Sequence, residues 1–135
     1  MPIIHTFEPN TLEFPLSEIK EYPFIREKII VVNSISELPD DYIFRAEEFL
    51  IEDIDFSLYS LILSYDLQIG KVVSARYKWG YDISEDQYQM SIIYQITKDV
   101  DETEMATLIR NAIIVDHISN NADVQNFISV SWIEN

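Results

Sequence analysis

Few residues in this chain are suited to acid–base, nucleophilic or metal chemistry. Histidine occurs only at His5 and His117, and cysteine is absent. His117 directly follows Asp116, but neighbouring residues on a helix point in different directions, so these two side chains form no ready-made catalytic dyad. Without cysteine the chain has no thiolate nucleophile, no thiolate metal ligand and no disulfide. This scarcity favours a non-catalytic protein.

Motifs that bind phosphate or metal ions are also missing. The two glycines, Gly70 and Gly80, are too few for the glycine-rich loops of dinucleotide-binding and P-loop proteins. The sequence Asp53-Ile54-Asp55 lacks the glycine and the closing glutamate of a calcium loop. The acidic residues between positions 99 and 104 are typical of a helix start, where negative charge is favoured. We therefore expect no cofactor and no metal ion.

The first candidate binding surface is the segment 47–56, in which acidic and apolar residues alternate. On a helix, this pattern turns more apolar side chains outward than one face can bury. An acidic rim around apolar anchors suits docking onto a basic, partly apolar protein. The alternative is an ordinary amphipathic helix whose carboxylates are solvated. The predicted partner-binding residues are Glu47, Glu48, Phe49, Glu52, Asp53 and Asp55.

The second candidate surface is aromatic and lies on the inner face of a predicted sheet. Tyrosine hydroxyls need hydrogen-bond partners when they are buried. Such side chains can line a pocket for a small apolar ligand, or they can place their hydroxyls at the edge of a solid core. The predicted pocket residues are Tyr59, Tyr65, Tyr77, Trp79 and Tyr94.

Both surfaces depend on three consecutive segments between residues 59 and 98, in which apolar and polar residues alternate. This period is typical of antiparallel strands with one buried face and one wet face. A three-residue turn at 68–70, with Gly70 in the left-handed position, would join the first two strands, and an even-numbered connection from Asp82 to Gln87 would join the last two. The predicted pairs are Tyr65–Val73, Leu63–Ala75 and Leu61–Tyr77 in the first hairpin, and Tyr81–Tyr88, Trp79–Met90 and Tyr77–Ile92 in the second.

Helices and further strands are expected on either side of this meander. The β-branched run within 28–33 predicts a strand, and apolar spacing predicts a helix at about 39–53. A strand there would rest on Tyr42, Phe44 and Ala46 but fails at Glu48. An acidic start followed by Met105, Leu108, Ile109 and Ala112 predicts a helix at about 101–119, packed on the aromatic sheet face, and 127–133 reads as a last strand. The expected fold is a single α+β domain, residues 1–135, with an antiparallel sheet built on the meander at about 57–98.

Charge is the strongest global feature of the chain. The 24 acidic and 9 basic residues give a formal net charge of −15, which repels phosphate backbones and anionic membranes. Nucleic acid and membrane are therefore excluded as expected partners, and a basic protein surface is favoured. The chain shows neither an apolar run near the ~20 residues of a membrane helix nor a cationic leader, so we expect a cytoplasmic protein.

Three functions remain open at this level. The first is an acidic, non-catalytic protein-binding module, such as a stoichiometric inhibitor or an immunity-type protein. The second is a small-molecule-binding protein or enzyme that uses the tyrosine-rich pocket. The third is a structural homo-oligomer, for example a homodimer in which an acidic patch of a second copy contacts Lys71, Arg76 and Lys78.

Overall fold

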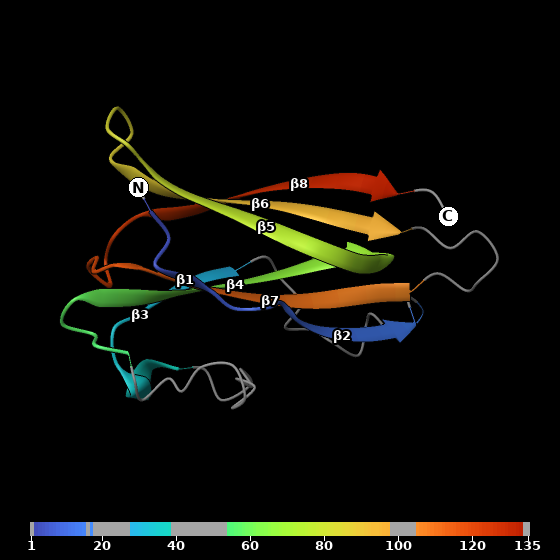
Figure 1. Ribbon diagram of the computed structural model, residues 1–135, viewed down its shortest axis with the longest axis horizontal. Helices are drawn as coiled ribbons and strands as arrows, with labels where there is room; N and C mark the ends of the chain where they lie inside the picture. The colour runs from blue at the N-terminus through green and yellow to red at the C-terminus, as the bar shows by residue number, and fades with distance from the viewer. Residues whose placement is uncertain (1, 16, 18–27, 39–53, 98–104, 134–135) are drawn as a thin grey trace.

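The computed structural model describes residues 2–15, 17, 28–38, 54–97 and 105–133, and in it two β-sheets lie face to face (Figure 1). Sheet A contains β1 (His5–Thr6), β2 (Asn10–Pro15), β3 (Lys28–Val32), β4 (Tyr59–Ile69) and β7 (Met105–Asp116). Sheet B contains β5 (Lys71–Asp82), β6 (Gln87–Thr97) and β8 (Val124–Ile133). No helix of seven or more residues occurs in these ranges, so the α+β prediction is wrong and the observed fold is mostly β.

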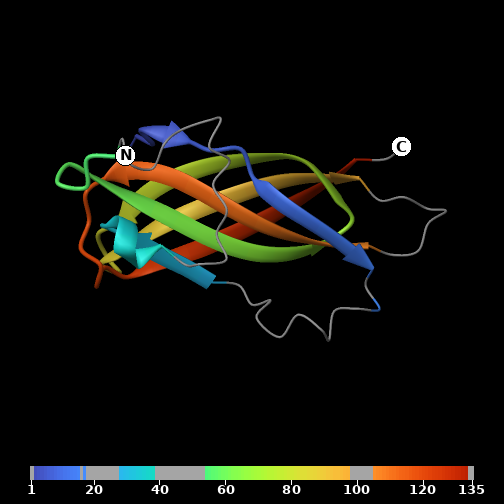
Figure 2. The ribbon, with the colours of Figure 1, turned by 90° about the horizontal axis from the view of Figure 1, so that it is seen from below.

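Sheet A is built around two long antiparallel strands, β4 and β7. Its strand order is β1-β7-β4-β3, and β2 pairs with β7 beyond β1, so the N-terminal segment covers one edge of β7 in two pieces. The strand predicted within 28–33 is confirmed as β3, which pairs with β4 at the opposite edge. Figure 2 shows the N-terminal strands and β3 on opposite sides of the molecule.

The helix predicted at about 101–119 is wrong, because residues 105–116 form strand β7. From Ala106 to Val115 every residue except Arg110 is buried, which means that both faces of this strand are covered. A nearly continuous apolar run is expected for a strand of this kind, and its spacing also matches the apolar side of a helix. The high content of isoleucine, valine and threonine is the feature that favours the strand.

Within the described ranges, no helix is long and apolar enough to cross a membrane.

The predicted hairpin between the first two meander strands is also wrong. Strand β4 pairs with β3 and β7 in sheet A, whereas β5 pairs with β6 in sheet B, so the predicted pairs Tyr65–Val73, Leu63–Ala75 and Leu61–Tyr77 do not form. The chain passes between the sheets at Gly70, which has a φ of 112°. A glycine with positive φ is compatible with a hairpin turn or with this crossing, and the alternation of apolar residues does not distinguish them.

The second predicted hairpin is confirmed. Residues Tyr81 and Tyr88, Trp79 and Met90, and Tyr77 and Ile92 are opposite one another, as the parity argument requires. A bulge between Val72 and Ser74 shifts the register near the start of β5 and leaves Val73 56% exposed, although Val73 was expected to point inward. The predicted C-terminal strand is confirmed as β8, which begins at Val124 and runs parallel to β6.

Two separate apolar clusters hold these layers together. The larger lies between the sheets and includes Ile62, Trp79, Met90, Tyr94 and Ile113. The smaller lies on the other face of sheet A, where its buried residues are Phe7, Val32, Ile54, Leu61, Leu63, Tyr65, Ala112 and Ile114. The single aromatic inner face predicted from parity is therefore wrong, because Tyr65 belongs to the smaller cluster and Tyr94 to the larger one.

Candidate functional site

Four loops meet at one end of the sandwich, on the left in Figures 1 and 2. Their proximity follows from the register: Val32 is opposite Leu61 near the start of β4, Tyr59 is opposite Asp116 at the end of β7, and the amide of Tyr88 donates to the carbonyl of Asp123 (2.8 Å). We call this end the acidic pole and define it as residues 33–38, 54–58, 82–87 and 116–123.

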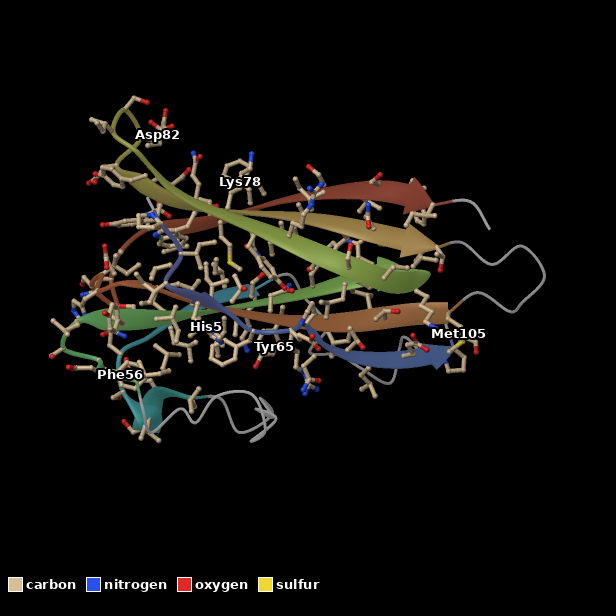
Figure 3. All side chains as sticks on the ribbon, viewed as in Figure 1. His5, Phe56, Tyr65, Lys78, Asp82 and Met105 are labelled. Carbon is tan, nitrogen blue, oxygen red and sulfur yellow. The ribbon has the colours of Figure 1, made fainter. Side chains whose placement is uncertain are left out.

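Among the residues that the structure describes, negative charge is concentrated at the acidic pole. It carries seven of the ten carboxylates in the described ranges, the other three being Glu8, Glu13 and Asp66, and these four loops contain no lysine or arginine. Figure 3 shows Asp82 and Phe56 in two loops at this end. The carboxylates of the pole are Glu37, Asp55, Asp82, Glu85, Asp86, Asp116 and Asp123.

Two of these carboxylates organise turns by the same local device, an Asp-X-Ser sequence. Asp55 Oδ1 accepts hydrogen bonds from the backbone amide (3.0 Å) and the hydroxyl (2.5 Å) of Ser57. Asp82 Oδ1 accepts the same pair from Ser84, at 3.0 and 2.7 Å. The serine hydroxyl hydrogen bond is the main cause that lowers the pKa of both carboxyl groups. Both groups therefore stay ionised at neutral pH.

Polar side chains tie the 33–38 loop to the 116–123 loop. The Glu37 carboxylate accepts from the backbone amide of Asn33 (3.1 Å) and from the side-chain amide of Asn120. Asn33 Nδ2 donates to the carbonyl of Ile118 (2.9 Å), and the Ile118 amide donates to Ser60 Oγ (2.9 Å). Because these bonds fix the loops before any partner arrives, binding would lose less conformational entropy.

The β5–β6 hairpin is tied into the same end. Asp123 accepts from the side-chain amides of Gln87 (3.4 Å) and Gln125 (2.7 Å). Asp86 has a φ of 50° and accepts a hydrogen bond from the Tyr81 hydroxyl, which raises the pKa of that phenol. Aspartate is one of the few non-glycine residues that adopt this left-handed backbone readily.

Large apolar side chains project among these carboxylates. Ile83, at the centre of the second Asp-X-Ser turn, is 85% exposed, Leu58 is 58% exposed and Ile35 is 53% exposed. Singly exposed apolar residues are common on proteins, but these three lie on three loops of one end, and the described residues of those loops include no lysine or arginine. Exposed apolar side chains beside charged ones are also found in protein-binding surfaces.

Nowhere in the described parts of the chain do three or more histidine, aspartate or glutamate side chains converge in a way that would hold a metal ion. His117 is exposed, and its Nδ1 lies 3.0 Å from the carbonyl oxygen of Phe56, where it links two loops of the pole.

Of the six predicted partner-binding residues, the structure describes one. Asp55 lies in the acidic pole, where it holds the turn described above. Glu47, Glu48, Phe49, Glu52 and Asp53 lie outside the described residues, as do the predicted helix at 39–53 and its strand alternative.

The predicted pocket residues are divided between the two clusters. Tyr59 and Tyr65 pack in the cluster on the far side of sheet A, and Tyr77, Trp79 and Tyr94 pack between the sheets. Tyr94 is fully buried, and its hydroxyl accepts a hydrogen bond from Asn111 Nδ2 (2.6 Å). The five side chains therefore share no common face.

Tyr77 does line a hollow, at the seam between the N-terminal segment and β5. This open groove has a volume of about 420 Å³ and is lined by Thr6, Phe7, Glu8, Pro9, Ala75, Arg76 and Tyr77. The volume is in the range of small-molecule sites. Arg76 and Glu8 give this lining one cation and one carboxylate, which suits a polar ligand better than the apolar ligand expected from the sequence.

Comparison with known proteins adds no assignment: no family model, no curated protein and no solved structure matches this chain. The function is therefore argued from geometry and charge. Sequence reasoning missed most of the acidic pole because its carboxylates are spread over four loops. The repeated Asp-X-Ser pattern at 55–57 and 82–84 was the available signal, since each copy marks a side-chain-capped turn.

Proposed function

We propose that this protein is a non-catalytic protein-binding module whose acidic pole docks onto a basic surface of another protein, in the manner of a stoichiometric inhibitor or immunity-type protein. The observation that carries the proposal is made on the four described loops of the pole, which together hold seven carboxylates, no lysine or arginine, and the exposed side chains of Ile35, Leu58 and Ile83.

The charge distribution supports a role in the association step. With a net charge of −15, the chain attracts a cationic surface from a distance, and the concentration of carboxylates at one end orients the approach. Electrostatic attraction of this kind raises the association rate and weakens as salt is added. The exposed apolar residues would then supply contacts that slow dissociation, since apolar anchors carry much of the binding energy in protein interfaces.

The rigidity of the pole supports the same proposal. Its loops are held by Glu37, Asn33 and Asn120 on one side and by Asp123 on the other, so the carboxylates of Glu37 and Asp123 are held in place by hydrogen bonds. A preorganised surface suits a stoichiometric complex, because little ordering remains to be done on binding.

The test begins with affinity capture from a cell lysate at low salt, followed by measurement of the stoichiometry and association rate with the captured protein. The double variant Glu85→Gln/Asp116→Asn removes two charges from the pole without touching the carboxylates that hold its turns. The control Glu8→Gln/Glu13→Gln removes two charges elsewhere. We expect the pole variant to associate several-fold more slowly and with a flatter salt dependence than the control.

Two results would contradict the proposal. One is a chain that stays monodisperse and captures no protein at low salt. The other is a captured protein whose association rate is changed equally by the pole variant and by the control, which would place the interface elsewhere.

A small-molecule function is the second candidate, and the groove beside Tyr77 is the observation that favours it. A panel of small anionic and zwitterionic metabolites, screened by thermal shift, tests it. A stabilising compound whose effect is abolished by Arg76→Gln but kept in Lys78→Gln, a control on the same strand, would support the groove. A panel with no stabilising compound would count against it.

A further inference from the structure

The groove beside Tyr77 lies where an edge of one sheet meets an edge of the other. Strand β5 is the first strand in the order β5-β6-β8, and β1 and β2 pair along one edge of β7. Figure 2 shows β5 and these N-terminal strands along the same side of the molecule. The walls of the groove are residues 6–9 on one side and residues 75–77 on the other.

A bulge in the N-terminal segment shapes the first wall. Between the paired residues of β1 and those of β2, three residues (7–9) span the same stretch as two residues of β7 (111 and 112). A bulge bends its strand and redirects a side chain, and bulges are frequent at sheet edges and next to active sites. Pro9 fits this position because it has no N–H group to pair. Glu8, at the centre of the bulge, is exposed and lines the groove.

Strand β5 supplies the second wall from both of its faces. Ala75 and Tyr77 pack against the cluster between the sheets, whereas Arg76 lies on the outer face and is exposed. All three residues line the groove, so it extends around the edge of the strand. The Tyr77 hydroxyl donates to Asn111 Oδ1 (2.5 Å), and this bond holds the phenol ring in place as part of the wall.

The two walls carry opposite charges. Glu8 brings a carboxylate on the N-terminal side, and Arg76 brings a guanidinium on the β5 side. An anionic ligand would place its charge near Glu8 and would also be repelled by a chain of charge −15. A cationic ligand would place its charge near Arg76. A zwitterion can pair with both groups and, because it is neutral overall, is not repelled by the chain at long range.

The rest of the lining is mostly apolar. Pro9, Ala75 and the ring of Tyr77 offer a surface to one apolar side chain, and the volume of about 420 Å³ is near the small end of the range for ligand sites. A small ligand that combines an ammonium group, a carboxylate and an apolar group matches this lining.

We infer that the groove binds a free α-amino acid with an apolar side chain. The carboxylate of the ligand pairs with Arg76, its ammonium group pairs with Glu8, and its side chain packs on Pro9 and Tyr77. The inference rests on the small-molecule function given above as the second candidate, and it names the ligand class. It does not depend on the acidic pole, because no residue of the groove belongs to the loops of the pole.

The test is an NMR titration of the isotope-labelled full chain with L-phenylalanine. We expect the backbone amide signals of Glu8, Arg76 and Tyr77 to shift. Three further ligands each lack one of the three groups: L-phenylalaninamide has no carboxylate, N-acetyl-L-phenylalanine has no ammonium group, and glycine has no side chain. Each should bind roughly fivefold more weakly, which is the usual loss for one contact of this strength at an exposed site.

Two variants assign the two ends of the ligand. Glu8→Gln should weaken the binding of L-phenylalanine roughly fivefold but not that of N-acetyl-L-phenylalanine, which has no ammonium group to lose a partner. Arg76→Gln should weaken the binding of L-phenylalanine but not that of L-phenylalaninamide. The controls Glu13→Gln on β2 and Lys78→Gln on β5 make the same charge changes outside the groove, and they should bind L-phenylalanine as the wild-type chain does.

The outcomes separate this inference from the small-molecule function. If L-phenylalaninamide or N-acetyl-L-phenylalanine binds as tightly as L-phenylalanine, the zwitterion is wrong and the small-molecule function stands. Tighter binding of glycyl-phenylalanine would assign the groove to peptides and overturn the amino acid. Shifts confined to residues outside the groove would overturn the site. If neither the amino acids nor any compound of the metabolite panel binds, the small-molecule function and this inference fail together.

Discussion

Tyr77 Oη lies 2.5 Å from Asn111 Oδ1, and this hydrogen bond joins β5 of sheet B to β7 of sheet A. Asn111 is fully buried and donates from Nδ2 to the hydroxyl of Tyr94, so a single amide connects three strands across the core. Burial raises the pKa of Tyr77, which keeps its hydroxyl protonated and able to donate.

The first prediction follows from this bond. Tyr77→Phe leaves a buried acceptor on Asn111 without its donor, and we expect it to lower the free energy of unfolding by about 1–3 kcal/mol. Tyr81→Phe, on the same strand, removes an exposed hydroxyl that bonds to Asp86, and its effect should stay within about 0.5 kcal/mol. Urea unfolding of both variants measures the difference. Equal losses would show that the buried network contributes no more than a surface contact.

The second prediction concerns the crossing point between the sheets. At Gly70 a Cβ atom would lie 2.7 Å from a side-chain carbon of Ile96 and 2.9 Å from the carbonyl oxygen of Thr97, on a backbone with positive φ. We expect Gly70→Ala to destabilise the fold by about 1–3 kcal/mol. Gly80→Ala is the control, because its Cβ meets no atom within 4 Å, and it should be neutral or slightly stabilising. Thermal unfolding compares the stability of the two variants. A Gly70→Ala variant as stable as the wild-type chain would mean that the backbone at the crossing accommodates the added methyl group.

The third prediction concerns pH and Asp66. Burial raises the pKa of this carboxyl group, and the hydrogen bond from Gln68 Nε2 (2.7 Å) opposes the shift only in part. A carboxyl whose folded pKa exceeds its unfolded pKa binds more protons in the folded state between the two values, so its contribution to stability falls as pH rises through that window. Asp66→Asn should remove this dependence and stabilise the protein at neutral pH by about 1 kcal/mol.

Denaturant unfolding at a series of pH values checks the third prediction. The curves of the wild-type chain and Asp66→Asn should converge below the ordinary aspartate pKa and separate above it. Asp55 provides the comparison, because the pKa of its exposed carboxyl is lowered instead. Its contribution to stability therefore increases as pH rises, opposite to that of Asp66. A wild-type chain that is more stable than Asp66→Asn at neutral pH would contradict the expected sign.

The fourth prediction separates stability from binding at the acidic pole. Ile83 is 85% exposed, so Ile83→Ser should change the free energy of unfolding by less than about 0.5 kcal/mol. If Ile83 is an anchor for a partner, the same variant should raise the dissociation rate of the complex while leaving the association rate nearly unchanged. Surface plasmon resonance with the captured partner resolves the two rates. An unaltered dissociation rate would remove Ile83 from the interface.

The alternation of apolar and polar residues predicted the buried side chains correctly where only one face of a strand is buried. In β6, Met90, Ile92, Tyr94 and Ile96 are all buried, as predicted, and the pairing of Trp79 with Met90 followed from parity and an even-numbered connection. These are local features, so the sequence near the hairpin was enough to derive them.

The same argument failed where both faces of a strand are covered. Ser60, Ser64 and Asp66 on β4 were expected to face water, but they are buried, and Ser64 Oγ accepts a hydrogen bond from Asn126 Nδ2 at 2.5 Å. Alternation locates the two faces of a strand but does not say what covers each one. That depends on strands far away in the chain, as does the choice between helix and strand for residues 105–116.

The pairing of β1 and β2 with β7 has a consequence for the order in which the protein can fold. Residues 5–15 pair with residues 105–114, and all of residues 16–104 must be synthesised before that partner strand leaves the ribosome. Such long-range closure is slow, so β1 and β2 of the nascent chain stay unpaired until residues 105–116 have left the ribosome.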